Sequence, residues 1–188
     1  MGMNINLKIK PLSPSLIDDY LLFFDDMVFS ENPHWSKCYC YSYHFTGANE
    51  DWTREKNRSA VIELISEEKM KGFLAYDDQK AVGWCNANHK ANYQSFRDVE
   101  ISESEICAIV CFLISPGYRR QGIAQKLLEA VINEYTFMAY DYIEAYPRKD
   151  NYSCERNYHG HSSLYEKYDF KMEKEFDDHY VVRKGLKK

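Results

Sequence analysis

The stretch Glu105–Tyr135, EICAIVCFLISPGYRRQGIAQKLLEAVINEY, constrains the fold more than any other part of the chain. Residues Glu105–Ile114 are almost all apolar, as expected of a central strand buried on both faces. Ser115-Pro116-Gly117 ends this strand, and the spacing of apolar residues predicts an amphipathic helix over Gly122–Tyr135. A further strand is predicted over Ala139–Tyr146. Together they form a β-α-β unit, which requires a parallel pair of strands.

The turn between this strand and helix has the properties of an anion site. The first N–H groups of a helix lack internal partners and lie at the positive end of the helix dipole. Gly122 allows a ligand to approach the backbone closely, and Arg119 and Arg120 add positive charge. A pyrophosphate suits such a place. The sequence contains no P-loop pattern and no G-x-G-x-x-G, which argues against a P-loop NTPase and a dinucleotide-binding fold.

Two motifs in this part of the chain match a known family. Arg119–Ala124 fits the pattern (Q/R)-x-x-G-x-(G/A), and Leu164–Phe170 fits L-Y-x-K-x-G-F except that Asp169 stands in place of the glycine. In this order, after an apolar strand, they resemble the GNAT superfamily of acetyl-CoA-dependent N-acetyltransferases. The resemblance implies a mixed α/β (α+β) fold with a mostly antiparallel sheet of six or seven strands. It further implies a splay between the fourth and fifth strands and helices on both faces.

The resemblance also implies where acetyl-CoA binds. Backbone N–H groups at the start of the helix would hold the pyrophosphate, the arginines would add charge, and the strand edge would pair with the pantetheine arm. Ala124 takes the place of the commoner second glycine of the motif. The predicted cofactor-binding residues are Phe112, Leu113, Ile114, Arg119, Arg120, Gln121, Gly122, Ile123 and Ala124.

Tyr165 is the predicted general acid, since the family's tyrosine at this place protonates the leaving thiolate of coenzyme A. A turn that needs positive φ tolerates Asp169 less well than glycine, so the backbone there is expected to differ from the family's. Glu105 is the predicted general base. Other candidates for the base are Glu144, His159 and His161, and Asn157 is a further candidate for contact with cofactor or substrate.

Composition narrows the remaining choices. The net charge of −5 argues against a sequence-independent nucleic-acid binder and loosely favours a cationic acceptor amine. No secretion signal or apolar run long enough for a membrane span is recognisable, so a cytoplasmic protein with six reduced cysteines is expected. No linker divides the 188 residues, which predicts a single domain over residues 1–188, acting as a monomer or homodimer on a small-molecule or peptide amine.

The segment HWSKCYCYSYHF is the least ordinary part of the sequence. Tyr39, Tyr41 and Tyr43 alternate with the thiols Cys38 and Cys40, which predicts a strand with two distinct faces. His34, Cys38, Cys40 and His44 are residue types that bind zinc, but the histidines would be about 33 Å apart on an extended strand. No metal site is therefore predicted. Cys107 and Cys111 are expected on one side of the central strand, as core residues.

The other elements follow from periodicity. Strands are predicted over 5–9, 72–76, 81–87, 170–176 and 179–183, and helices over 14–29, 51–71, 93–99 and 162–168. The leading function is direct acetyl transfer to a primary amine. Its main rival is a non-catalytic CoA-binding or regulatory module of the same fold, and a third reading is a metal-binding interaction module built on the Cys38/Cys40 segment.

Overall fold

A seven-stranded mixed sheet is the framework of the protein, in a computed structural model that describes residues 6–97, 104–149 and 157–186. The strand order is β1-β2-β3-β4-β5-β7-β6. β4 and β5 are parallel, and the other neighbouring pairs are antiparallel. The strands are β1 (Leu7–Pro11), β2 (Gly72–Asp77), β3 (Lys80–His89), β4 (Ile106–Ile114), β5 (Tyr142–Ala145), β6 (Lys171–Glu175) and β7 (Tyr180–Gly185).

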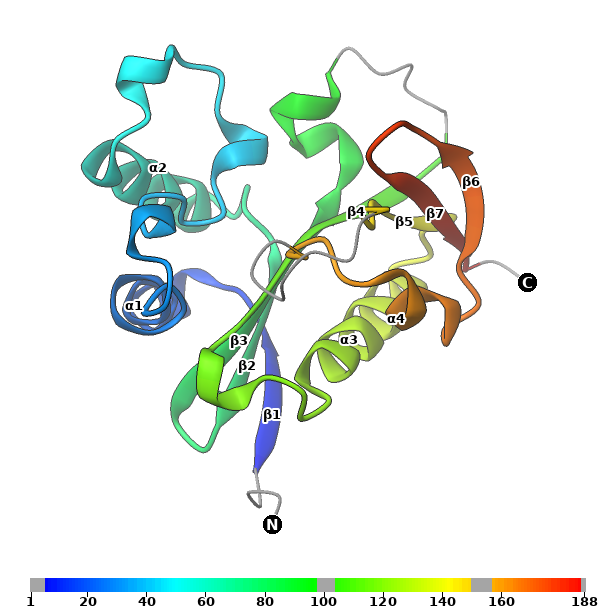
Figure 1. Cartoon of the computed structure of the whole chain (residues 1–188), viewed down its shortest axis with the longest axis horizontal. Helices are drawn as coiled ribbons and strands as arrows, with labels where there is room; N and C mark the ends of the chain where they lie inside the picture. Colours follow the sequence, from blue (N-terminus) through cyan, green and yellow to red (C-terminus); the bar gives the residue numbers. More distant parts are fainter. Residues whose placement is uncertain (1–5, 98–103, 150–156, 187–188) are drawn as a thin grey trace.

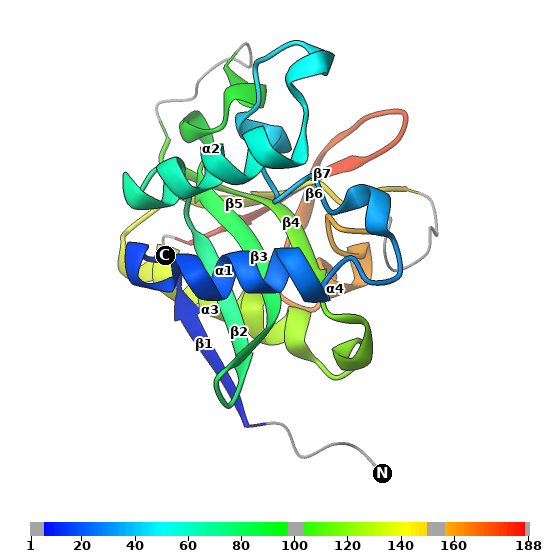
Figure 2. The same ribbon diagram turned by 90° about the vertical axis from the view of Figure 1, so that its left-hand side faces the viewer.

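Helices cover both faces of the sheet (Figure 1). α1 (Ile17–Leu22) and α2 (Arg54–Ser66) lie on one face, and α3 (Ile123–Phe137) and α4 (Ser162–Glu166) lie on the other. Figure 2 shows α1 and α2 in front of the strands, with α3 behind them. Each face has its own hydrophobic core, because the alternating side chains of the central strands point to opposite sides. The predicted fold class is confirmed.

The sheet splays beyond the middle of β4. β5 pairs with β4 only from Ile106 opposite Tyr142 to Ile109 opposite Ala145. β4 then continues to Ile114, paired with β3 alone. The expected splay between the fourth and fifth strands is therefore present, and within the described ranges no strand pairs with the other edge of Val110–Ile114.

A β-bulge in β4 overturns the predicted placement of two cysteines. The register with β3 shifts between Asn86 and Ala87, so that Val110 is the extra residue. Cys107 consequently packs in the core under α3, whereas Cys111 packs in the core under α1 and α2. Both are buried core residues as predicted, but the inference that they share a side is wrong, since it assumed an unbroken alternation.

The segment between α1 and α2 contains the other main corrections. The predicted first helix changes after Leu22 into a π-type turn over Phe23–Met27, with Val28 N–H bonded to the Phe23 carbonyl at 3.1 Å. The predicted strand of alternating tyrosines and thiols is wrong. Tyr39 and Cys40 have φ of 45° and 53°, and two left-handed residues in succession reverse the chain.

Long-range contacts hold this reversal in place. The Tyr20 hydroxyl donates to the Tyr39 carbonyl at 2.6 Å, and the Tyr39 hydroxyl donates to Asp25. Asp25 in turn pairs with Arg54 at 2.8 Å and Arg58 at 3.2 Å. These partners come from two helices, so the local alternation could not reveal them.

The short helix predicted around residues 93–99 is two 3₁₀ turns over Lys90–Asn92 and Gln94–Phe96, and residues 98–99 lie outside the described part of the chain. The five cysteines within the described ranges are free thiols. Within the same ranges, no helix is both long and apolar enough to cross a bilayer.

Candidate active site

The edge of β4 that faces away from β3 borders a cavity at the start of α3. The Phe112 N–H donates to the Tyr158 carbonyl at 2.5 Å, and the Ile114 carbonyl accepts from Arg119 Nε at 3.3 Å. Both groups therefore point away from β3, as strand alternation requires. Phe112, one of the predicted pantetheine-binding residues, already has a backbone partner in this structure.

The cavity, called here the α3 cavity, has a volume of about 390 Å³. It combines residues of β4, the loop before α3, α3 itself and the chain leading into α4. Its lining includes seven of the nine predicted cofactor-binding residues: Phe112, Ile114, Arg119, Arg120, Gly122, Ile123 and Ala124. The other two lie elsewhere. Leu113 faces the α1 and α2 side, and Gln121 Nε2 donates to the Gly117 carbonyl at 3.0 Å.

The backbone at the start of α3 is shaped for an anion. Gly122, the N-cap, has φ of 80°, and a Cβ placed on it would meet no atom within 4 Å. Lys126 N–H is bonded to the Gly122 carbonyl at 3.1 Å, so the N–H groups of the preceding helical residues have no helical acceptor. Because α3 is 15 residues long, its dipole adds positive potential at this end.

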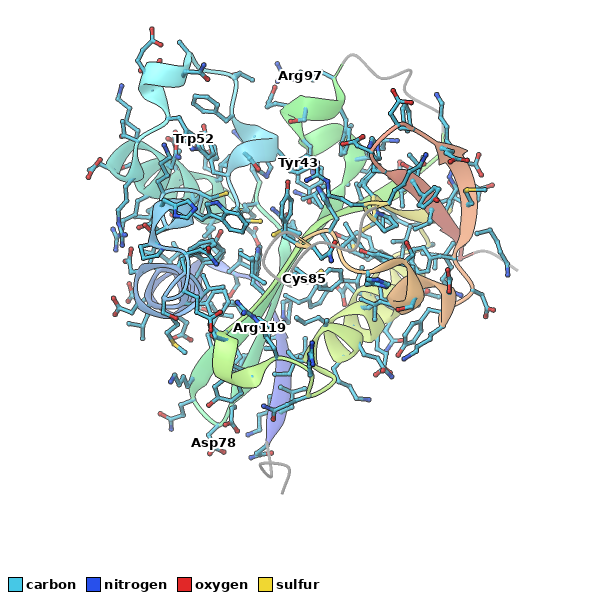
Figure 3. The ribbon with its side chains drawn as sticks, viewed as in Figure 1. Tyr43, Trp52, Asp78, Cys85, Arg97 and Arg119 are labelled. Atoms are coloured by element: carbon cyan, nitrogen blue, oxygen red, sulfur yellow. The ribbon has the colours of Figure 1, made fainter. Side chains whose placement is uncertain are left out.

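The two arginines of the motif differ in their surroundings. Arg119, labelled in Figure 3, forms an ion pair with Glu31 at 2.7 Å. This pair connects the loop before α3 to the segment between α1 and α2. Arg120 is exposed, with φ of 60°. The sequence could not foresee the pair with Glu31, because the two residues are 88 positions apart.

Tyr165 is fully buried beside the α3 cavity and is not one of its lining residues. Its hydroxyl donates to the His159 carbonyl at 2.5 Å, and burial raises its pKa well above the ordinary value. The ring packs against Gly160, which does line the cavity: a Cβ on Gly160 would lie 2.9 Å from the hydroxyl oxygen. Asp169 has φ of 61°, so this turn takes a positive φ although an aspartate stands in place of the glycine.

Glu105 and Glu144 lie by a different cavity. This hairpin cavity, of about 640 Å³, is bordered by the β6–β7 hairpin, β5 and the 3₁₀ turns after β3. Glu105 precedes the first residue of β4, whereas the α3 cavity begins at Phe112, about 20 Å further along the strand. The exposed Glu105 carboxylate pairs with His89 at 3.1 Å. The structure does not bring Glu105 together with Tyr165 or the predicted cofactor residues.

Glu144 is held by two cations. Lys90 and Arg183 each approach its carboxylate to 2.6 Å. Burial raises the pKa of Glu144, but the hydrogen bonds from Lys90 and Arg183 outweigh it and leave the pKa below the ordinary value. A carboxylate so paired is a structural ion and a poor proton acceptor.

The two histidines weighed as bases have different surroundings. His161 is exposed, and its Nδ1 accepts from the Ser163 N–H at 3.3 Å, which caps α4. His159 is buried. Burial lowers its pKa to about 4, against a smaller raising effect of a hydrogen bond with the Val110 backbone, and its Nδ1 has no partner among the described residues. His159 is therefore neutral at pH 7. Asn157, also proposed from the sequence, lines the α3 cavity.

A third cavity lies on the opposite face of the β4 end. This aromatic cavity, of about 250 Å³, is lined mainly by the segment between α1 and α2 and by β4. Its walls are Phe29, His34, Trp35, Lys37, Cys38, Cys40, Ser42, Tyr43, Trp52, Val110, Cys111, Leu113 and Tyr158. The sequence analysis singled out this segment, but only Tyr43 of the three alternating tyrosines lines the cavity. In the part of the chain that the structure describes, no three His, Cys, Asp or Glu side chains form a metal site.

The sequence matches the acetyltransferase (GNAT) family over residues 33–175, which is more than half of the chain. The chain belongs to this family. It is an acyl-CoA-dependent acetyltransferase by family, and acetyl-CoA is its co-substrate, as the sequence predicted. No curated protein matches the sequence.

Solved structures share this fold at low sequence identity. PaiA N-acetyltransferase from Thermoplasma acidophilum, in complex with coenzyme A, is 14% identical with a TM-score of 0.58, over 96% of this chain and 99% of that one. A GNAT-family acetyltransferase from Desulfovibrio desulfuricans is 15% identical with a TM-score of 0.60, over 96% and 99%. The ribosomal-protein-S18-alanine N-acetyltransferase of Escherichia coli is 12% identical with a TM-score of 0.57, over 97% and 95%.

Proposed function

We propose that this acetyltransferase moves the acetyl group of acetyl-CoA directly to a primary amine of a small molecule or peptide. The observation that carries the proposal is the α3 cavity. There the open backbone of Gly122, the dipole of α3 and the edge of β4 that faces away from β3 converge at the splay. The pyrophosphate of the cofactor would sit at the helix start, with Arg120 adding charge, and the pantetheine arm would follow β4.

The reaction needs one bond made and one broken. The amine nitrogen attacks the thioester carbonyl, the C–S bond breaks, and coenzyme A leaves as a thiolate that takes up a proton. In this proposal Tyr165 supplies that proton, since its raised pKa keeps the hydroxyl protonated at neutral pH. For this role the hydroxyl must turn from the His159 carbonyl toward the cavity, past Gly160.

The proposed base needs revision. Glu105 is remote from the β4 end, and Glu144 is occupied by Lys90 and Arg183. No carboxylate lines either the α3 cavity or the aromatic cavity within the described residues. We propose that alignment of the amine with the thioester provides most of the acceleration, since orientation alone can supply several kcal/mol.

Calorimetric titration with acetyl-CoA tests the donor site, and thiol release in the presence of an amine panel tests the chemistry. Binding of acetyl-CoA together with amine-dependent release of free thiol is the expected result. Absence of binding at millimolar acetyl-CoA would contradict the proposed donor site.

Binding without amine-dependent thiol release would favour the rival function, a non-catalytic CoA-binding module. The buried hydrogen bond of Tyr165 and the absence of a carboxylate from the two cavity linings are the observations that favour this rival.

A further inference from the structure

The aromatic cavity and the α3 cavity lie on opposite faces of the same strand end. Leu113 lines the first and packs with the core under α1 and α2, whereas Phe112 and Ile114 line the second and pack with the core under α3. A small cavity of about 30 Å³ lies between them. It shares Trp35 and Leu113 with the aromatic cavity, and Ile114 with the α3 cavity. A molecule in the aromatic cavity is therefore next to the place where β4 would hold the thioester.

The walls of the aromatic cavity are rich in aromatic side chains and contain no carboxylate among the described residues. Five of its lining residues are Phe, Tyr or Trp, and Figure 3 shows two of them, Tyr43 and Trp52, on the segment that joins α1 to α2. Burial raises the pKa of Cys38 to about 11 and that of Cys111 well above the ordinary value. Burial also acts to raise the pKa of Cys40, but its hydrogen bonds, chiefly with Cys111, outweigh burial and lower it. Lys37 and His34 are its basic residues, and Asp and Glu are missing from this described lining.

These walls discriminate between classes of amine. A polyamine or aminoglycoside carries several cations, which would lose hydration here without a carboxylate to pair with. An arylalkyl amine would bury its ring against aromatic side chains, a gain of a few kcal/mol, and its single ammonium could rest on a ring face. The net charge of −5, which loosely favoured a cationic acceptor, is carried elsewhere on the molecule.

The same walls would help to generate the nucleophile. Transfer of an ammonium into an apolar site lowers its pKa, because desolvation disfavours the charged form. The neutral amine, which is the form that attacks the thioester, becomes more populated. An apolar cavity can in this way supply part of what a carboxylate base would supply.

We propose that the acceptor is a primary amine on a short chain attached to an aromatic ring, and that the ring binds in the aromatic cavity. This inference rests on the proposed acetyl transfer. The amine nitrogen would reach the β4 end and attack the acetyl carbon as the C–S bond breaks. Tyr165 would protonate the departing thiolate and recover its proton from the acylated amine, so the products are the N-acetyl arylalkyl amine and coenzyme A.

Three amines of different class test the inference: 2-phenylethylamine, ethylamine and spermidine. With acetyl-CoA at saturation, thiol release and product mass give kcat/KM for each. Phenylethylamine should exceed ethylamine, which lacks the ring, and spermidine by about tenfold or more, since ring burial is worth at least one factor of ten.

A preference for spermidine or ethylamine would overturn the acceptor class and leave acetyl transfer intact. No thiol release with any of the three amines, in a protein that binds acetyl-CoA, would count against acetyl transfer itself.

Trp35→Ala locates the ring, because Trp35 lines both the aromatic cavity and the small cavity beside it. The KM for phenylethylamine should rise about tenfold while the KM for acetyl-CoA stays unchanged. Phe137→Ala is the matched control, since Phe137 is 88% exposed at the end of α3. An unchanged KM in a folded Trp35→Ala protein would contradict the assignment. If that variant does not fold, Trp52→Ala addresses the same wall.

Discussion

At the scale of single residues, the position of a side chain in a sequence motif does not determine its partners in the structure. Tyr165 occupies the motif position of the acid, yet its hydroxyl is buried and bonded to a backbone carbonyl. Arg119 occupies a phosphate-loop position, yet it pairs with Glu31. The motif predicted which residues gather at the β4 end, and their side-chain partners depended on residues far away in the sequence.

Replacement of Tyr165 by Phe separates its two possible roles. Loss of the proton donor should lower kcat about 100-fold or more, with little change in the affinity for CoA. Loss of the hydrogen bond to the His159 carbonyl should also cost about 1–3 kcal/mol of stability, which a thermal melt would show. Tyr168→Phe is the control, since the Tyr168 hydroxyl bonds Glu129 on α3. Unchanged turnover of Tyr165→Phe would remove the acid assignment and leave only the structural role.

At the scale of elements, the strands and helices predicted best are those whose own residues show a clear hydrophobic pattern. β4 is continuously apolar and α3 has regular apolar spacing, so both were expected within a few residues of their observed bounds. The segment between α1 and α2 was mispredicted because Tyr20 of α1 and Arg54 of α2 fix it, Arg54 through Asp25. The bulge at Val110 likewise appears only in the pairing with β3, so sequence alternation put Cys107 and Cys111 on one face.

The turn before α3 can be tested as an element by two glycine substitutions. Gly122→Ala places a Cβ on a residue with φ of 80°, at about 1 kcal/mol of strain, and directs a methyl into the open space where the pyrophosphate would bind. Affinity for CoA should fall about tenfold in calorimetry. Gly117→Ala, on the same loop, places its Cβ where no atom lies within 4 Å and no positive φ is required, and should bind CoA normally. Equal affinities of the two variants would count against a pyrophosphate at Gly122.

At the scale of the whole molecule, two buried histidines, His44 and His159, lie among aromatic side chains of the segments that connect the strands and helices. His44 packs on Tyr93 with ring centroids 5.0 Å apart, and His159 packs near Tyr43 at 6.1 Å. Burial lowers the pKa of each histidine to about 4. In the unfolded chain a histidine titrates near 6.5. Folding therefore favours the neutral form of both rings, and stability becomes linked to pH through them.

The direction of these two pKa shifts predicts how the free energy of unfolding changes in acid. Below about pH 6.5 the unfolded chain binds protons at both histidines, whereas the folded chain binds them only near pH 4. Stability should thus fall as the pH drops through this window, by about 2 kcal/mol per histidine at pH 5. Asp25 and Glu144, whose pKa values are lowered, lose their contribution only below their ordinary values of 3.8 and 4.5. Urea titrations at pH 7 and pH 5 measure the difference. As a control, His34→Gln removes an exposed histidine and should lose as much stability between pH 7 and pH 5 as the unaltered protein does. Equal stability of the unaltered protein at both pH values would mean that His44 and His159 are not buried as neutral rings.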